Sequence, residues 1–218
     1  MTRHYDLVVF DWDGTLMDSE SAIVDALNTA CVAMGLPVPP LDRARYVIGL
    51  GLEDALRYAV PDLQSCDYAQ LVKHYRRRYL SYDKHLRLFP GIFKLIAWLR
   101  RQNCILAVAT GKSRAGLTQA LENTALTHSF HATRCADESF SKPHPAMLEE
   151  LMDEFCIPAE RCLMIGDTTH DLNMAKNAGV EALAVSYGAH SAEVLMQHSP
   201  LDCVHSVENL YKWLQKYL

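Results

Sequence analysis

The sequence lacks paired cysteine motifs, a surplus of positive charge and long apolar runs. Its seven cysteines are scattered and never spaced as Cys-x-x-Cys, so neither a zinc site nor a disulfide framework is indicated. The formal net charge of −5 argues against nucleic acid or an anionic membrane surface as a partner. The first apolar run ends at Asp11, and no segment approaches the ~18 apolar residues of a membrane span. We therefore expect a cytoplasmic protein.

An apolar run that ends in two acids stands near the start of the chain. Residues 7–10 form this unbroken run, which predicts a strand buried on both faces. Because side chains alternate along a strand, Asp11 and Asp13 should point to one side while Trp12 turns away. Two neighbouring buried carboxylates persist when a cation neutralises them or when one keeps a proton. Both situations are more typical of chemistry than of structure.

The rest of the chain divides into a helical block and an alternating region. At 218 residues, 50% of them hydrophobic, the chain can form one large core and a smaller appended one. Only helix-period segments occur in residues 41–82, whereas helices and apolar strands alternate from Phe89 onward. Such alternation predicts a parallel sheet covered on both faces, with the helical block inserted after the first strand. The predicted helices are 42–47, 52–59, 67–82, 92–101, 113–123, 145–155, 170–178, 192–198 and 207–217, after one that ends at Gly35, and the later strands are 105–109, 130–133, 162–165, 182–185 and 203–204.

Polar side chains interrupt three of the predicted strands where those strands end. Asp11 and Asp13 follow the first strand, Thr110 and Gly111 follow the second, and residues 166–171, Gly-Asp-Thr-Thr-His-Asp, follow another. In open α/β sheets, ligands bind at this carboxyl edge, where the strand order reverses. A fourth polar group, Ser-Lys-Pro at 141–143, directly precedes a predicted helix. These segments should meet at one site.

The four segments resemble the motifs of haloacid-dehalogenase-superfamily phosphohydrolases. The matching residues are Asp-x-Asp-Gly-Thr-Leu at 11–16, Thr110-Gly111, Lys142-Pro143 and Gly166-Asp167 with a second acid at Asp171. Their order and context are similar across essentially the whole chain, and the helical insertion resembles the cap of the phosphoglycolate-phosphatase-like subgroup. The resemblance implies a Rossmann-like doubly wound parallel sheet core, residues 1–18 plus 86–218, and a small all-helical cap domain, residues 19–85, inserted after strand 1.

The resemblance also implies the roles of the residues that react with phosphate. Phosphoryl transfer needs in-line attack, neutralised phosphate oxygens and a protonated leaving oxygen. Asp11 would be the nucleophile, forming an aspartyl-phosphate. Asp13 would protonate the leaving oxygen and later accept a proton from the hydrolytic water. Thr110, Gly111 and Lys142 would bind the phosphate oxygens.

A charge count at this site predicts a metal ion. Asp11, Asp13, Asp167 and Asp171 bring negative charge against the single positive charge of Lys142, so a phosphate dianion needs a divalent cation to approach. All-oxygen ligation suits Mg²⁺. Asp11 and Asp167 would be side-chain ligands, and by resemblance the backbone carbonyl of Asp13 would be a third. Asp171 would be a supporting acid, which either acts from behind the metal ligands or positions Lys142.

The insertion offers the candidates for substrate specificity. Arg45 and Gly49 lie where the family's cap carries its specificity loop. Ser19 is a candidate too, although Asp18 or Ser19 could simply cap the helix that follows. As partner we expect a small phosphorylated metabolite, and we expect a monomer or a homodimer.

These features predict a Mg²⁺-dependent phosphatase for a small phosphomonoester, with phosphoglycolate as the first substrate by resemblance. Inorganic pyrophosphate or a nucleoside monophosphate is an alternative substrate. A phosphomutase of the β-phosphoglucomutase type is less favoured, because such enzymes carry a histidine where this chain has Ile23. Dehalogenases and phosphonate hydrolases of the superfamily are also disfavoured, because both lack an acid at the position of Asp13. A non-catalytic binding module is least favoured, since it need not keep all four motifs.

Overall fold

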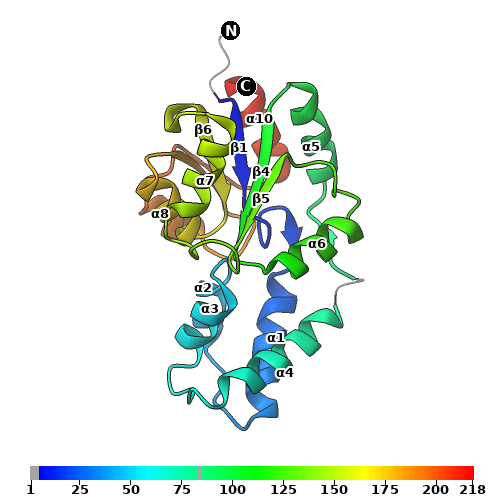
Figure 1. Ribbon diagram of the computed structural model, residues 1–218, viewed down its shortest axis with the longest axis vertical. Helices are drawn as coiled ribbons and strands as arrows, with labels where there is room; N and C mark the ends of the chain where they lie inside the picture. Colours follow the sequence, from blue (N-terminus) through cyan, green and yellow to red (C-terminus); the bar gives the residue numbers. More distant parts are fainter. Residues whose placement is uncertain (1–4, 83–84) are drawn as a thin grey trace.

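A six-stranded parallel sheet forms the centre of the larger part of the molecule. The computed structural model describes residues 5–82 and 85–218, and the sheet has the strand order β5-β4-β1-β6-β7-β8. Figure 1 labels the four strands β5, β4, β1 and β6 of this order. The chain builds outward from β1 through β4 to β5 and then returns to the other side of β1 with β6. The strand order therefore reverses beside β1. The strands are β1 Leu7–Phe10, β4 Ile105–Thr110, β5 Ala132–Cys135, β6 Cys162–Gly166, β7 Glu181–Val185 and β8 Cys203–Val204.

Helices cover both faces of this sheet, which explains why its strands are apolar throughout. Val8 and Phe10 pack into one buried cluster with α5, α6 and α10, whereas Leu7 and Val9 pack into another with α7, α8 and α9. Alternate residues of β1 thus enter opposite cores. The helices are α5 Ile92–Arg101, α6 Arg114–Asn123, α7 Ala146–Phe155, α8 Thr169–Asn177, α9 Ala192–Met196 and α10 Val207–Tyr217, with a short 3₁₀ turn, η1, at Ala159–Arg161.

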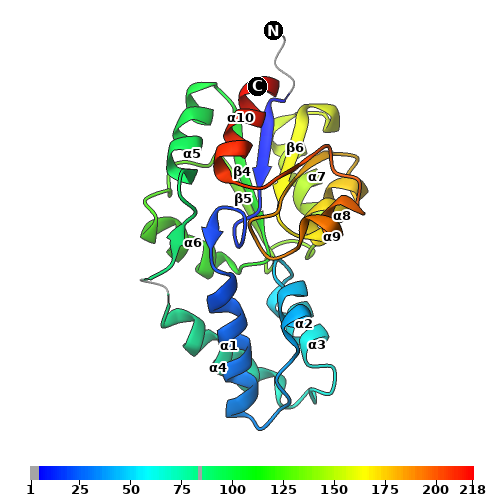
Figure 2. The same ribbon diagram turned by 180° about the vertical axis from the view of Figure 1, so that it is seen from behind.

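The inserted block forms a separate helical unit, the cap, at one end of the sheet. Figures 1 and 2 show it beyond the carboxyl ends of the strands. Its helices are α1 Glu20–Ala33, α2 Leu41–Tyr46, α3 Leu52–Ala59 and α4 Tyr68–Leu80. They bury a cluster of their own that includes Leu27, Val47, Leu56 and Leu71. Since this cluster shares no buried residue with the two sheet cores, the cap has its own apolar centre.

A small antiparallel pair of strands joins the cap to the sheet region. In β2 Met17–Asp18 and β3 Arg87–Leu88, Met17 faces Leu88 and Asp18 faces Arg87. The two crossings of the chain between core and cap are therefore side by side. We did not predict this pair, because two-residue strands are too short to show a hydrophobic period.

The predicted fold class is confirmed: an α/β core with a parallel sheet and an all-helical insertion. The strand predicted at 130–133 lies two residues later, at Ala132–Cys135. Its sequence is Ala-Thr-Arg-Cys and only Cys135 is fully buried, so it has little apolar signal. The division at residues 19 and 85 stays a prediction, and residues 1–4 and 83–84 of the predicted units lie outside the described part. Among the described residues, no helix combines the length and the apolarity needed to cross a bilayer.

Candidate active site

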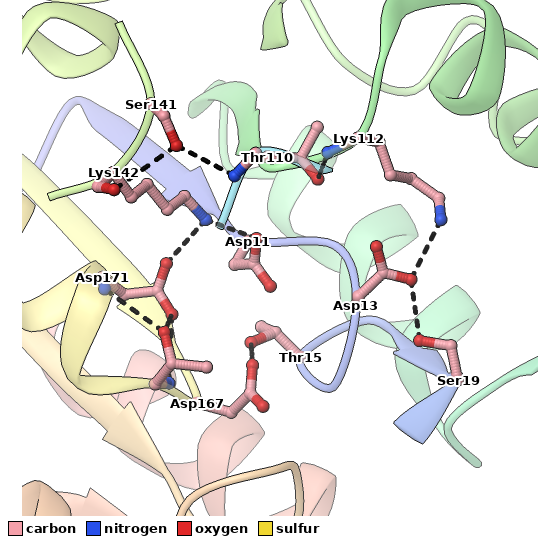
Figure 3. Close-up of polar contacts among 12 residues, drawn as sticks. Asp11, Asp13, Thr15, Ser19, Thr110, Lys112, Ser141, Lys142, Asp167 and Asp171 are labelled. Carbon is pink, nitrogen blue, oxygen red and sulfur yellow. Dashed lines mark hydrogen bonds and ion pairs between the residues drawn. The ribbon is translucent and has the colours of Figure 1, made fainter. Parts of the chain in front are cut away.

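The site lies at the carboxyl edge of the sheet, where β1, β4 and β6 end. The backbone N–H of Asp11 donates to the carbonyl of Ile165 at 2.9 Å, so Asp11 continues the pairing of β1 with β6 by one residue. Asp167 follows β6 directly, and Thr110 is the last residue of β4. All three side chains are completely buried. The predicted convergence of the motifs is therefore present in the structure (Figure 3).

Lys142 is the cation at the centre of the buried acids. Its Nζ donates to Oδ1 of Asp11 and, at 2.7 Å, to Oδ1 of Asp171. The side chains of all three residues are fully buried. Burial alone would lower the pKa of Lys142, but the attraction of the two carboxylates outweighs it and raises that pKa. Lys142 therefore keeps its positive charge, and it ties β1 to the start of α8.

Asp171 is held by the protein at both of its oxygens. Oδ1 accepts from Lys142, and Oδ2 accepts from the backbone N–H of Thr168 at 3.0 Å and from its hydroxyl at 2.7 Å. Thr168 and Asp171 form the capping box of α8, in which the cap and the third helical residue satisfy each other's donors. Asp171 has the surroundings of a group that orients Lys142, and this role stays a prediction.

The Asp167 carboxylate is enclosed by two hydrogen-bond donors and by the backbone of two glycines. Oδ1 accepts from the Thr15 hydroxyl at 2.7 Å, and Oδ2 accepts from the backbone N–H of Ala189 at 2.7 Å. Two glycines make room for it: a Cβ on Gly14 would lie 2.1 Å from Oδ2, and one on Gly188 would lie 2.2 Å from it. The close approach of two loops thus fixes the Asp167 carboxylate beside Asp11.

The buried acids fit a hard divalent cation. One carboxylate oxygen each from Asp11, Asp167 and Asp171 can be chosen so that all three lie within 4.8 Å of one another, and Oδ2 of Asp11 is buried without a hydrogen-bond partner. Burial raises the pKa of Asp11 well above its usual range, and burial together with Asp171 raises the pKa of Asp167 to about 7. An unpartnered buried carboxylate oxygen needs a cation or a proton. Oxygen ligands of this kind suit Mg²⁺.

Asp13 lies apart from this cluster and is held by a second set of donors. Its Oδ1 receives hydrogen bonds from the Ser19 hydroxyl at 2.7 Å and from Lys112 Nζ at 3.1 Å, with the Tyr79 hydroxyl at 3.5 Å. Figure 3 shows Ser19 and Lys112 beside Asp13, and Lys142 and Asp171 beyond Asp11. Ser19 occupies the N-cap position of α1, yet its side chain makes no capping hydrogen bond. Ser19 therefore holds the predicted N-cap position, but its hydroxyl donates to Asp13 and does not cap the helix.

The loop between α2 and α3 covers the site from the cap side. The backbone N–H of Gly51 donates to the Ser141 hydroxyl at 2.9 Å. A Cβ on Gly49 would lie 3.3 Å from Oγ1 of Thr168, so this loop touches the core at two separate segments. Arg45 instead pairs with Glu20 of α1 at 2.6 Å, and its side chain is 46% exposed. The part of Arg45 and Gly49 in substrate choice stays a prediction.

An aromatic contact also holds the cap against the core. The ring of Tyr46, at the end of α2, stacks on His190 with centroids 5.7 Å apart, and its carbonyl oxygen lies 2.6 Å from Nε2 of His170. Burial lowers the pKa of both histidines, that of His190 to about 4, so both rings are neutral near pH 7. This contact joins residues far apart in the chain, so no local sequence pattern predicts it.

Gly111 provides a direct test of the fit between cap and core. A Cβ there would lie 2.3 Å from the carbonyl oxygen of Leu50, so Gly111→Ala should push the covering loop away while the core still folds. We expect kcat/KM to fall about 10- to 100-fold, since small misplacements of a covering element cost this much, with little change in Tm. Gly116→Ala in α6 is the matched control, because its Cβ has 3.4 Å to the nearest atom. Unchanged kinetics in Gly111→Ala would contradict the observed contact.

Comparison with known proteins agrees with this geometry. The family model described as haloacid dehalogenase-like hydrolase matches residues 8–185. The chain belongs to the haloacid dehalogenase-like hydrolase family. It is 38% identical over 89% of its length to a protein named probable phosphatase IndB from Dickeya dadantii, covering 86% of that protein. It is 30% identical to a phosphoglycolate phosphatase from Aliivibrio fischeri, with 92% of each chain covered.

A solved structure of another protein has the same fold as this chain. A protein described as a predicted phosphoglycolate phosphatase from Haemophilus somnus superimposes with a TM-score of 0.88, covering 98% of this chain and 99% of that one at 23% identity. The family match and the two relatives confirm the predicted membership and subgroup, and the chain is a phosphatase of the haloacid dehalogenase-like type. Lys112 and Thr15 were not among the predicted site residues, although both lie within two residues of a motif residue that was assigned a role. That adjacency was the available signal.

Proposed function

We propose that this protein is a Mg²⁺-dependent phosphatase that hydrolyses a small phosphomonoester through an aspartyl-phosphate. The observation that supports it best is Asp11 itself. One of its oxygens accepts from Lys142, and the other is buried without a partner among acids. A carboxylate in this position has a cation to orient it and an oxygen available for bonding. Phosphoglycolate is the first substrate to test, because the A. fischeri relative carries that name.

The reaction has two steps, and side chains of the protein take part in both. An oxygen of Asp11 bonds to phosphorus while the ester O–P bond breaks, and Asp13 gives its proton to the departing oxygen. Water then attacks the phosphorus of the aspartyl-phosphate, Asp13 takes a proton from that water, and the bond between the Asp11 oxygen and phosphorus breaks. Lys142, the Thr110 hydroxyl and the backbone at Gly111 bind the phosphate oxygens throughout.

Asp11, Asp167 and the carbonyl of Asp13 would hold the Mg²⁺, with Asp171 supporting Lys142. The ion would neutralise the phosphate oxygens as charge develops in the transition state. The role of the protein is to exclude bulk water and to keep the carboxylates close together. The cap loop and the aromatic contact of Tyr46 with His190 cover the site, so closure would strengthen every charge interaction in it.

A phosphate-release panel tests the proposed function. Phosphoglycolate, pyrophosphate, nucleoside 5′-monophosphates and p-nitrophenyl phosphate are each assayed with and without Mg²⁺. Release that requires Mg²⁺ and is fastest with a small phosphomonoester would support the proposal. Faster release from pyrophosphate or a nucleotide would favour the alternative substrates, and interconversion of sugar phosphates without release would favour a mutase. No release from any compound would overturn the assignment of a phosphatase.

Magnesium should stabilise the protein, and more so at higher pH. The raised pKa of Asp167, about 7, means that the metal-free acids keep protons below that pH, and Mg²⁺ must displace them. At ~100 times its Kd, Mg²⁺ would add about 2.7 kcal/mol, or several degrees in Tm. We expect the full gain at about pH 8 and a smaller gain at about pH 5.5, measured by thermal melts. Asp167→Asn should remove most of it, and an equal gain at both pH values would contradict the assignment.

A further inference from the structure

Lys112 is a buried cation at the site that the proposed chemistry does not use. Its side chain is only 11% exposed, and Nζ contacts Asp13 Oδ1 at 3.1 Å and the Tyr79 hydroxyl at 2.8 Å. Lys142, by contrast, is engaged by Asp11 and Asp171. A buried lysine is costly without an anion beside it. In this structure, the carboxylate that pairs with Lys112 is that of Asp13.

The position of Lys112 relates it to the leaving group and not to the phosphate. Asp13 must come within hydrogen-bond reach of the ester oxygen that departs. Since Nζ of Lys112 bonds to Asp13, it lies roughly two hydrogen-bond lengths, ~6 Å, from that oxygen. A carboxylate on the carbon that bears the ester oxygen fits this span. An amide, a hydroxyl or a hydrocarbon at that place would leave the charge of Lys112 unmatched.

Because of Tyr79, the surroundings of the Lys112 ammonium depend on the position of the cap. It belongs to α4, whereas Lys112 follows β4 of the core. Its hydroxyl bonds to Lys112, and Nζ lies 4.6 Å from the centre of its ring. The ring attracts the ammonium through its negative face. The lysine and the tyrosine hydroxyl are therefore together only when the cap is seated on the core.

We infer that Lys112, completed by Tyr79, selects substrates whose leaving group carries a carboxylate next to the ester oxygen. This inference rests on the proposed phosphatase function and adds the residue that decides its substrate class. The incoming carboxylate accepts hydrogen bonds from Nζ and takes the place of Asp13 as the partner of Lys112. Asp13 is then free to turn to the leaving oxygen. The substrates of this class are phosphate esters of 2-hydroxy acids.

A purely structural role for Lys112 predicts a different result. If Lys112 only positions Asp13, its loss slows every substrate alike. If it binds the leaving group, its loss slows the carboxylate substrate selectively. Two compounds of nearly equal size separate the two roles: 2-phosphoglycolate, and 2-hydroxyethyl phosphate, in which the carboxylate is replaced by a hydroxymethyl group.

The test compares kcat/KM for these two compounds in the wild type and in Lys112→Met, with Mg²⁺ present. We expect the wild type to prefer 2-phosphoglycolate and Lys112→Met to lose about 10- to 100-fold of that preference, mainly through KM, as is typical when a charged hydrogen bond is removed. Lys112→Arg keeps the charge and should retain part of the preference. Tyr79→Phe keeps the ring and should lose several-fold. Lys212→Met, at an exposed lysine of α10, is the matched control.

The outcomes distinguish this inference from the function on which it rests. Equal losses for both compounds in Lys112→Met, or no preference in the wild type, would overturn the selection of a carboxylate while leaving the phosphatase intact. Mg²⁺-dependent release from p-nitrophenyl phosphate reports on the phosphatase alone. If Lys112→Met does not fold, the Tyr79→Phe ratio decides, and an unchanged ratio there would overturn the inference.

Discussion

Asp11→Asn is expected to abolish phosphate release while leaving the fold intact. The amide has nearly the shape of the carboxylate and can still meet Lys142, but it cannot form the aspartyl-phosphate. Loss of a nucleophile that acts together with its neighbours lowers kcat by at least ~10⁴-fold. Turnover of the best substrate in the panel is the measurement, with circular dichroism to confirm folding.

Two further observations make the Asp11 test decisive. Asp153→Asn, at an exposed acid of α7, changes the same atoms away from the site and should turn over normally. Brief quenching of the wild type with substrate should give a protein mass increased by one phosphoryl group, which Asp11→Asn should lack. Near-normal turnover in Asp11→Asn would show that another group attacks phosphorus.

The second large effect concerns stability. Lys142→Met leaves Asp11 and Asp171 buried without their common cation, and removing one partner of a buried ion pair costs about 3–5 kcal/mol. We expect the free energy of unfolding in urea, without Mg²⁺, to fall by that amount and activity to be lost. Adding Asp171→Asn should restore part of the stability but none of the activity, because one unpaired charge is removed and the phosphate still lacks its lysine.

A surface lysine is the control for this experiment. Lys73→Met, at an exposed position of α4, removes a charge that no buried acid needs and should change stability little. A Lys142→Met protein as stable as the wild type would mean that the two acids are satisfied some other way. No regain of stability in the double variant would place the cost outside the pair of Lys142 with Asp171.

Most of the core was predictable from the sequence, because its signals are local. The run from Leu7 to Phe10 is apolar at every position and is a strand buried on both faces. Helix α5 begins and ends at the predicted residues, Ile92 and Arg101. Strand β5 was predicted two residues too early. Its polar residues Thr133 and Arg134 bond to neighbouring side chains and are only partly buried, so the strand has no hydrophobic period that would mark its position.

The site residues that could not be predicted contact partners that are far from them in the sequence. Lys112 meets Tyr79 of the cap and Asp13 of the first motif, and Tyr46 meets His190. Motif reasoning finds Asp11 and Lys142 because their spacing and context are shared by a family. Pairs that join the cap to the core depend on how two separately packed units meet, and only coordinates reveal that.

The pairing of β2 with β3 has a consequence for the history of the chain. Asp18 and Arg87 are direct neighbours across the pair, so the cap is attached through a single paired stem. A short turn could join the two strands in its place, because closing a shorter loop costs less entropy. No strand of the main sheet would have to be rethreaded. Recombination could thus exchange one lid for another over the same phosphate chemistry, with substrate range inherited separately from the catalytic acids.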